Sequence, residues 1–151
     1  MIPELGNLCL IIALALTIIQ TVFPIIGAAN GNYAWMSLAR PVARLQFLFV
    51  GIAFLILTYS FLVHDFSVAY VAHNSNSMLP VMYRISAVWG AHEGSLLLWA
   101  LILSGWTIAV TFYSQRLPIQ FLARVIGVMG SVSIGFLLFM LLTSNPFDRL
   151  F

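Results

Sequence analysis

Four long apolar stretches are the feature that most constrains how this chain of 151 residues can fold. They cover approximately residues 5–29, 45–63, 95–113 and 121–143. A bilayer core about 30 Å thick needs roughly 20 apolar residues in a helix. Each stretch is close to that length. The sequence therefore predicts an all-α fold: a polytopic membrane bundle of four transmembrane helices, forming a single membrane domain over residues 1–151.

The composition supports a membrane protein and excludes several other classes. The chain is 62% hydrophobic and only 7% charged, whereas soluble domains carry about 25% charged residues. A soluble enzyme and a disordered chain are therefore both excluded. The surplus of two basic residues is too small to indicate a nucleic-acid partner, so the lipid bilayer is the expected surrounding. Cys9 is the single cysteine and cannot form an internal disulfide.

The arginines predict the orientation of the bundle. Arg40 and Arg44 lie between the first two stretches, and Arg116 and Arg124 flank the turn between the last two. Loops rich in arginine face the cytoplasm. The N-terminus, the loop of residues 64–94 and the C-terminal segment are then expected outside. That outer side holds all the acids and histidines, which are Glu4, Asp65, Glu93, Asp148, His64, His73 and His92.

The fourth stretch contains a regular row of small residues. Gly127, Ser131 and Gly135 recur every four positions. Small side chains allow a second helix to approach closely in a membrane. We interpret this row as a helix-packing face.

The outer loop is too apolar to be a solvated linker, and its second half has a helical pattern. Ser77 is placed to cap a helix N-terminus and Pro80 to occupy its first turn. Arg84 and Ser86 lie away from the apolar face. The apolar residues at helical spacing are Val81, Ile85, Val88 and Trp89. The pattern predicts a short amphipathic helix on the membrane surface.

A histidine–glutamate pair lies where this loop joins the third stretch. Glu93 is expected near a helix N-terminus, where the helix dipole favours an anion. His92 has the chemistry to bind a metal, a haem iron or a haem propionate, or to move a proton. The simpler interpretation is that both residues cap the helix and pair with Arg84. No HExxH, CxxC or paired-histidine motif is present, so no metal site is predicted.

Two tryptophans mark one face of the third stretch. Trp99 and Trp106 are seven residues apart, and Trp106 falls near the middle of the bilayer. Tryptophan usually prefers the membrane interfaces. A buried indole at this depth is expected to pack against another helix or against a flat hydrophobic cofactor.

Four strings in and around the outer loop resemble a known family. They are DFSVAYVA at 65–72, NSN at 74–76, LPVMYR at 79–84 and WGAHEGSLLLW at 89–99. Together they resemble the N-terminal part of the CcmF family, the haem lyase subunits of bacterial cytochrome c maturation, which belong to the haem-handling WWD-domain membrane proteins. MIPELGN at 1–7 and TSNPF at 143–147 resemble the same family, so the resemblance covers the whole chain.

The resemblance implies a multi-pass protein of the bacterial inner membrane. It implies haem as cofactor and covalent attachment of haem to the CxxCH motif of apocytochrome c on the periplasmic side. The implied partners are other maturation subunits, including a haem chaperone and an apocytochrome-binding subunit, and the remainder of the same protein. The family's WWD signature and haem-ligand histidines have no counterpart in this sequence, so no catalytic residue is assigned. The chain therefore resembles an N-terminal fragment or one part of a split protein.

The resemblance also ranks the candidate residues. Those expected nearest a haem or apocytochrome platform are Trp89, His92, Glu93 and Trp99. Those expected to contact partners or to support the structure are Asn74, Ser75, Asn76, Arg84, Gly90, Gly94, Asn145, Pro146 and Phe147.

Three other functions are alternatives to the haem lyase hypothesis. One is a structural or assembly subunit without haem chemistry of its own. Another is a membrane cytochrome b, for which His64 is the nearest candidate ligand and has no obvious transmembrane partner. A proton- or ion-translocating subunit would need ionisable residues at membrane depth, and the sequence places none there.

Overall fold

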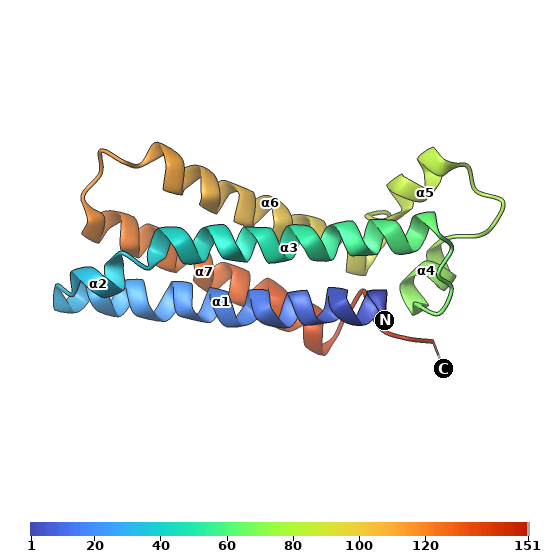
Figure 1. Cartoon of the computed structure of the whole chain (residues 1–151), viewed down its shortest axis with the longest axis horizontal. Coiled ribbons are helices and arrows are strands. Elements are labelled where there is room, and N and C mark those ends of the chain that lie inside the picture. Colours follow the sequence, from blue (N-terminus) through green and yellow to red (C-terminus); the bar gives the residue numbers. More distant parts are fainter. Residues whose placement is uncertain (151) are drawn as a thin grey trace.

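The four predicted spans are present as four long helices in the computed structural model, which describes residues 1–150 (Figure 1). These helices are α1 (Ile2–Asn30), α3 (Ala39–Leu62), α6 (His92–Tyr113) and α7 (Ile119–Leu142). Each is long and apolar enough to cross a membrane. The prediction of an all-helical, four-span bundle is confirmed, and the chain is a multi-pass membrane protein.

Three short helices connect the long ones. They are α2 (Tyr33–Met36), α4 (Ala69–Asn74) and α5 (Val81–Ala87). Helix α2 lies beside the end of α1, whereas α4 and α5 lie together at the opposite end of the bundle, near the N-terminus (Figure 1). We call the end with α4, α5 and residues 143–150 the loop end. The other end, with residues 31–38 and 114–118, is the hairpin end.

Helix α1 is the centre of the packing. It runs along both α3 and α7, while α6 packs mainly against α3 and less closely against α7. The core between the helices is apolar and fully closed around large side chains such as Leu10, Leu57, Phe61, Leu97 and Leu137. The side of α6 and α7 that faces away from α1 remains open.

The face of α7 that packs on α1 differs from the predicted row of small residues. A Cβ atom on Gly127 would overlap Ile25, and one on Gly130 would come within 2.5 Å of the Thr21 hydroxyl oxygen. By contrast, Ser131 is exposed and Gly135 has open space around it. Four residues turn an α-helix through about 40° more than a full circle. A row at every fourth position therefore leaves the contact face, and only Gly127 of the predicted row packs within this chain.

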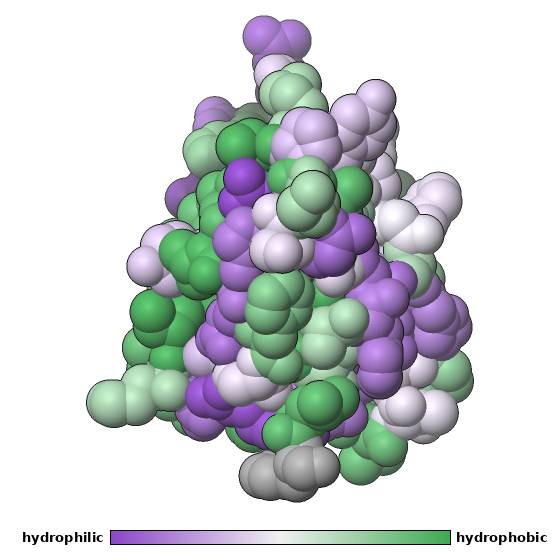
Figure 2. Space-filling model, turned by 90° about the vertical axis from the view of Figure 1, so that its right-hand side faces the viewer, coloured by the Kyte–Doolittle hydropathy of each residue, from purple (hydrophilic) through white to green (hydrophobic). Residues whose placement is uncertain are grey.

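The charged residues separate to the two ends of the bundle. At the hairpin end, Arg40 donates to the carbonyl oxygen of Ser114 (3.4 Å), and Arg44 lies over the ring of Phe112, 4.5 Å from its centroid. The loop end is more polar, and hydrophilic side chains cover much of it in the end-on view of Figure 2. This separation agrees with the sequence pattern on which the orientation rests. The orientation itself stays a prediction.

Candidate functional site at the loop end

The Tyr70 hydroxyl is the centre of the loop end. Helix α4 carries this side chain into the interior, where it is only 4% exposed. Its hydroxyl donates to the carbonyl oxygen of Val88 (2.8 Å) and accepts from the backbone N–H of Ala91 (3.3 Å). The Phe61 ring packs edge-on against it, with centroids 5.4 Å apart. Burial raises the pKa of Tyr70, so the hydroxyl keeps the proton that it donates.

Gly94 allows the chain before α6 to fold back onto the first turn of that helix. A Cβ atom here would overlap the carbonyl oxygen of Val88 and come within 2.5 Å of the Tyr70 hydroxyl. Ser95 adds a bond from its hydroxyl to the carbonyl oxygen of Trp89 (2.8 Å). At Gly90 the nearest atoms to an added Cβ are 3.6 Å away, which is ordinary contact. The two glycines of the junction therefore have different roles.

His92 links the start of α6 to the segment that follows α7. Its Nε2 atom lies 3.0 Å from the Ser144 hydroxyl oxygen, and its ring packs edge-on against Phe139. The residue before it, Ala91, is the N-cap of α6 and provides no side-chain cap. Glu93 is half-buried in the first turn, where the helix dipole favours its charge. The expectation that the His92–Glu93 pair caps the helix is wrong.

Arg84 does not pair with Glu93 but turns toward the end of α3. Its Nη1 donates to the carbonyl oxygen of Leu62 (2.7 Å), and its Nε donates to that of Leu79 (3.1 Å). A cation near a helix C-terminus is favoured by the free carbonyls and by the dipole. The expectation that Arg84 pairs with the His92–Glu93 pair is therefore wrong, because its guanidinium donates to these backbone carbonyl oxygens instead.

Helix α5 exists where the pattern predicted it, but its start differs. Pro80 is the N-cap, without a side-chain hydrogen bond, and Ser77 lies in the preceding turn. Val88, just after the helix, is fully buried, whereas Trp89 is exposed. The membrane-surface position of α5 stays a prediction. Helix α4 has no counterpart among the predicted elements, since six residues are too few for a clear helical period.

The polar run of residues 74–76, at the end of α4 and just after it, makes local hydrogen bonds. Asn74 donates from its amide to the carbonyl oxygen of Tyr70 (2.9 Å), and Asn76 accepts from the backbone N–H of Met78 (2.9 Å). The Ser75 hydroxyl is buried and has no hydrogen-bond partner among residues 1–150. The run thus fixes the turn between α4 and α5.

Residues 145–147 fasten the segment after α7 to the start of α1. Asn145 donates to the side chain of Asn7 (2.8 Å) and accepts from the backbone N–H of Phe147 (2.9 Å). The Phe147 ring lies against Gly6, where any Cβ atom would overlap it. Pro146 is also buried. The contacts of Asn145 and Phe147 thus hold the segment after α7 against α1, and the role of residues 145–147 stays a prediction.

The last described residues close the loop end. The backbone N–H of Ala69 donates to the carbonyl oxygen of Asp148, and that of Leu150 donates to Ser67 (both 2.8 Å). Arg149 forms an ion pair with Glu4 (2.6 Å). Four segments that are distant in sequence therefore meet here: the start of α1, the α3–α4 connection, the start of α6 and the segment after α7.

Comparison with known proteins places this arrangement in a family. The family model described as cytochrome C assembly protein matches residues 89–149. CcmF of Pseudomonas aeruginosa is 63% identical over 150 residues, and CcmF of Escherichia coli K12 is 54% identical over 149. A solved structure described as cytochrome c heme lyase CcmF matches with a TM-score of 0.93 and 30% identity. This chain belongs to the CcmF family.

The match covers nearly all of this chain but only part of each relative. It spans 99% of the chain and 23% of either CcmF sequence, and 100% of the chain and 25% of the solved structure. Another relative, NrfE of Haemophilus influenzae, is 37% identical over 151 residues, which is 24% of its length. The region matched by the family model starts at Trp89 and ends at Arg149. The matched region therefore includes the junction before α6, both α6 and α7, and most of the segment that closes the loop end.

The two tryptophans of α6 lie on its open side and not in the core. Trp99 is 60% exposed and Trp106 is 66% exposed. With Val132 and Phe136 of α7 they line a groove of about 200 Å³. An adjoining pocket of about 380 Å³, which Gly135 helps to line, continues toward the loop end. Trp106 is therefore a residue of the groove wall and not a buried core residue.

The described residues do not fit a haem by themselves. Haem iron needs an axial ligand such as histidine, methionine or cysteine. None of these types lines either groove pocket, and His92 is already bonded to Ser144. Within residues 1–150 no three His, Cys, Asp or Glu side chains gather as a metal site. Within residues 1–150 the two groove pockets therefore provide no axial ligand for haem iron.

Three residues that hold the loop end together are missing from the candidates selected from the sequence. They are Tyr70, which bonds to Val88, Ser144, which contacts His92, and Gly6, which packs on Phe147. Tyr70 looks like one apolar position among several, and Ser144 gives no local signal. For Gly6, a glycine inside an apolar helix is a detectable sign of close packing.

Proposed function

We propose that this chain forms a four-helix membrane part of a cytochrome c haem lyase, and that its loop end supports the covalent attachment of haem to the CxxCH motif of apocytochrome c. The observation that carries the proposal is that nearly the whole chain matches a part of CcmF in sequence and in structure. The relatives are named for cytochrome c-type biogenesis, and the solved structure for the lyase. The loop end then faces the periplasm from the bacterial inner membrane.

In this proposal the chain holds the contact residues in position and carries no residue that takes part in the reaction. The Tyr70–Gly94 contacts fix where α6 begins, and hence where His92 and Trp89 are presented at the surface. An exposed indole supplies a flat apolar surface, and a histidine supplies a donor or acceptor near neutral pH. Such a surface is suited to contact a porphyrin edge or an apocytochrome segment. The haem ligands, the chaperone that delivers haem and the apocytochrome-binding subunit lie outside this chain.

A competing role is that of a scaffold without contact to haem or apocytochrome. The observation that favours it is that His92 and Arg84 both make structural contacts. The two roles predict different results when His92 and Ser144 are changed separately. In the first role only the His92 side chain contacts haem or apocytochrome, whereas in the scaffold role neither side chain does.

The test is His92→Ala in the complete CcmF protein, beside Ser144→Ala. Both variants remove the same hydrogen bond. If His92 contacts haem or apocytochrome, His92→Ala lowers covalent cytochrome c at unchanged CcmF level, while Ser144→Ala keeps most of it. Equal and small losses in both variants would support the scaffold instead. His73→Ala, an exposed histidine at the end of α4, is the control.

The orientation has its own test. In a Cys9→Ser background, a cysteine placed at the exposed Asn76 is expected to react with an impermeant thiol reagent added from the periplasmic side. A cysteine at the exposed Gln115 is expected to react only after the membrane is opened. The reverse labelling pattern would overturn the proposed orientation without affecting family membership.

A further inference from the structure

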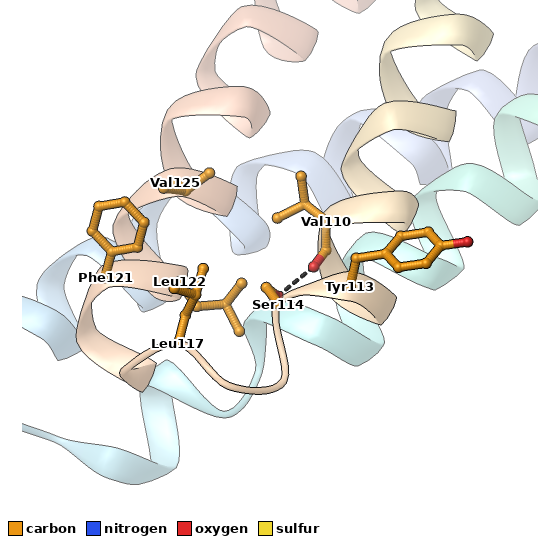
Figure 3. Close-up of a pocket in the computed structure, with 7 residues that line it drawn as sticks. All are labelled: Val110, Tyr113, Ser114, Leu117, Phe121, Leu122 and Val125. Carbon is orange, nitrogen blue, oxygen red and sulfur yellow. Dashed lines mark hydrogen bonds between the residues drawn. The ribbon is translucent and has the colours of Figure 1, made fainter.

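A second, separate pocket lies at the hairpin end between α6 and α7. Its volume is about 370 Å³, and its lining is almost wholly apolar. Figure 3 shows Val110 on α6 and Val125 on α7 facing each other across it, with Leu117 and Leu122 below them, while the Tyr113 ring points away. A pocket of this size and lining suits a narrow hydrocarbon group.

The end of the bundle that holds this pocket is strongly basic. Arg40, Arg44, Arg116 and Arg124 all lie at the hairpin end, and the four acids of the chain all lie at the loop end. Arg116 and Arg124 are exposed, and neither forms an ion pair with any residue from 1 to 150. Each is adjacent in sequence to residues of the pocket wall. The charge of these two arginines is thus uncompensated within residues 1–150.

A third arginine approaches the pocket wall from α3. Arg40 donates from Nη2 to the carbonyl oxygen of Ser114, which is a lining residue. The Nε atom of Arg40 is buried and has no hydrogen-bond partner within the described part of the chain. A buried N–H without a partner is costly, so an acceptor at this position would be favoured.

We propose that this pocket binds an anionic phospholipid: one acyl chain occupies the apolar slot, and the phosphate is held by Arg116 and Arg124, with Arg40 at its edge. Basic pockets between transmembrane helices bind anionic lipid headgroups. Arginine pairs with phosphate through two parallel hydrogen bonds. A free inorganic anion would satisfy the charge but leave the apolar slot empty, so the lipid is the better match. This site is independent of the function proposed for the loop end.

The experiment uses the complete CcmF protein in neutral detergent, titrated with phosphatidylglycerol or phosphatidylcholine and examined by native mass spectrometry. The wild type is expected to retain phosphatidylglycerol preferentially. Arg116→Gln and Arg124→Gln are each expected to weaken that binding by about fivefold. The matched control is the double variant Gln115→Ala/Gln120→Ala, which changes exposed neutral side chains on the same hairpin and is expected to bind as the wild type does.

Further arms separate the alternative occupants. Val125→Trp fills the slot and is expected to reduce phosphatidylglycerol binding while leaving the arginines intact. Equal retention of both lipids, or unchanged binding by Val125→Trp, would overturn the proposal. Competition by millimolar inorganic phosphate as effective as that by the lipid would assign a free-anion site. A cysteine at Val125 in the Cys9→Ser background that resists a lipophilic thiol reagent would assign the slot to another helix of CcmF.

Discussion

The loop end and the hairpin end of this bundle are built in different ways. At the loop end, hydrogen bonds join residues far apart in sequence, as from Tyr70 to Val88 and from His92 to Ser144. At the hairpin end, two short connections turn the chain, and Arg40 and Arg44 make the cross-helix contacts. A substitution at the loop end is therefore expected to disturb several segments at once. One at the hairpin end is expected to have a smaller and more local effect.

The largest effect is expected for Gly94→Ala at the loop end. The added Cβ would overlap a backbone carbonyl oxygen, which cannot move without shifting the junction. We expect a loss of stability of about 3 kcal/mol or more, the upper range for overpacking. Thermal unfolding of complete CcmF in detergent measures it. Gly90→Ala, where an added Cβ has ordinary contacts, is the control; equal losses in both would contradict the packing described here.

A smaller effect is expected for Gly6→Ala, where the clash is with the side chain of Phe147. Because a ring can shift more easily than backbone, we expect a loss of about 1–2 kcal/mol. The comparison at the hairpin end is Gly31→Ala, which has open space but a positive φ of 69°. Left-handed backbone alone costs about 1 kcal/mol. Restoration of Gly6→Ala stability by Phe147→Leu would confirm the contact, and no restoration would argue against it.

Tyr70→Phe tests the hydroxyl at the centre of the loop end. Removing its bond to Val88 is expected to cost about 1 kcal/mol, and Tyr83→Phe, on an exposed ring, is expected to cost nothing measurable.

The same residue predicts a pH dependence. An unfolded tyrosine has a pKa near 10, and burial raises the pKa of Tyr70 in the folded protein. Its contribution is therefore complete below about pH 10 and is lost as the pH rises toward the folded value. Tyr70→Phe should lack that part of the loss, and identical alkaline unfolding of both proteins would contradict it.

The smallest effect is expected at the hairpin end itself. Gln115→Ala and Gln120→Ala change exposed side chains with no tertiary partner within the described chain. Each is expected to alter stability by no more than about 0.5 kcal/mol. A loss as large as that of Tyr70→Phe would show that these glutamines have tertiary contacts as important as those of Tyr70. The two ends of the bundle would then not differ in how they are stabilised.

The spans were predictable because their signal is local. Twenty apolar residues identify a membrane helix whatever surrounds them, so the four long helices agree with their predicted positions within a few residues, except for the earlier start of α3 at Ala39. The junction at 89–99 and the residues 145–147 were also recognisable, because they form compact strings. The partners of individual side chains were not. Arg84 had two possible partners: the carboxylate of Glu93, nine residues away in sequence, and the carbonyl oxygens at the distant end of α3.

The sequence by itself determined the fold class, the separation of charge between two ends and the family resemblance, since these depend on composition, spacing and short strings. Only the tertiary structure decided that Tyr70 and Gly94 shape the junction, that Gly130 and not Ser131 packs against α1, and that Trp99 and Trp106 face an open groove. The physical reason is that helix periodicity fixes which residues share a face. Which face meets which neighbour depends on how all four helices fill space together.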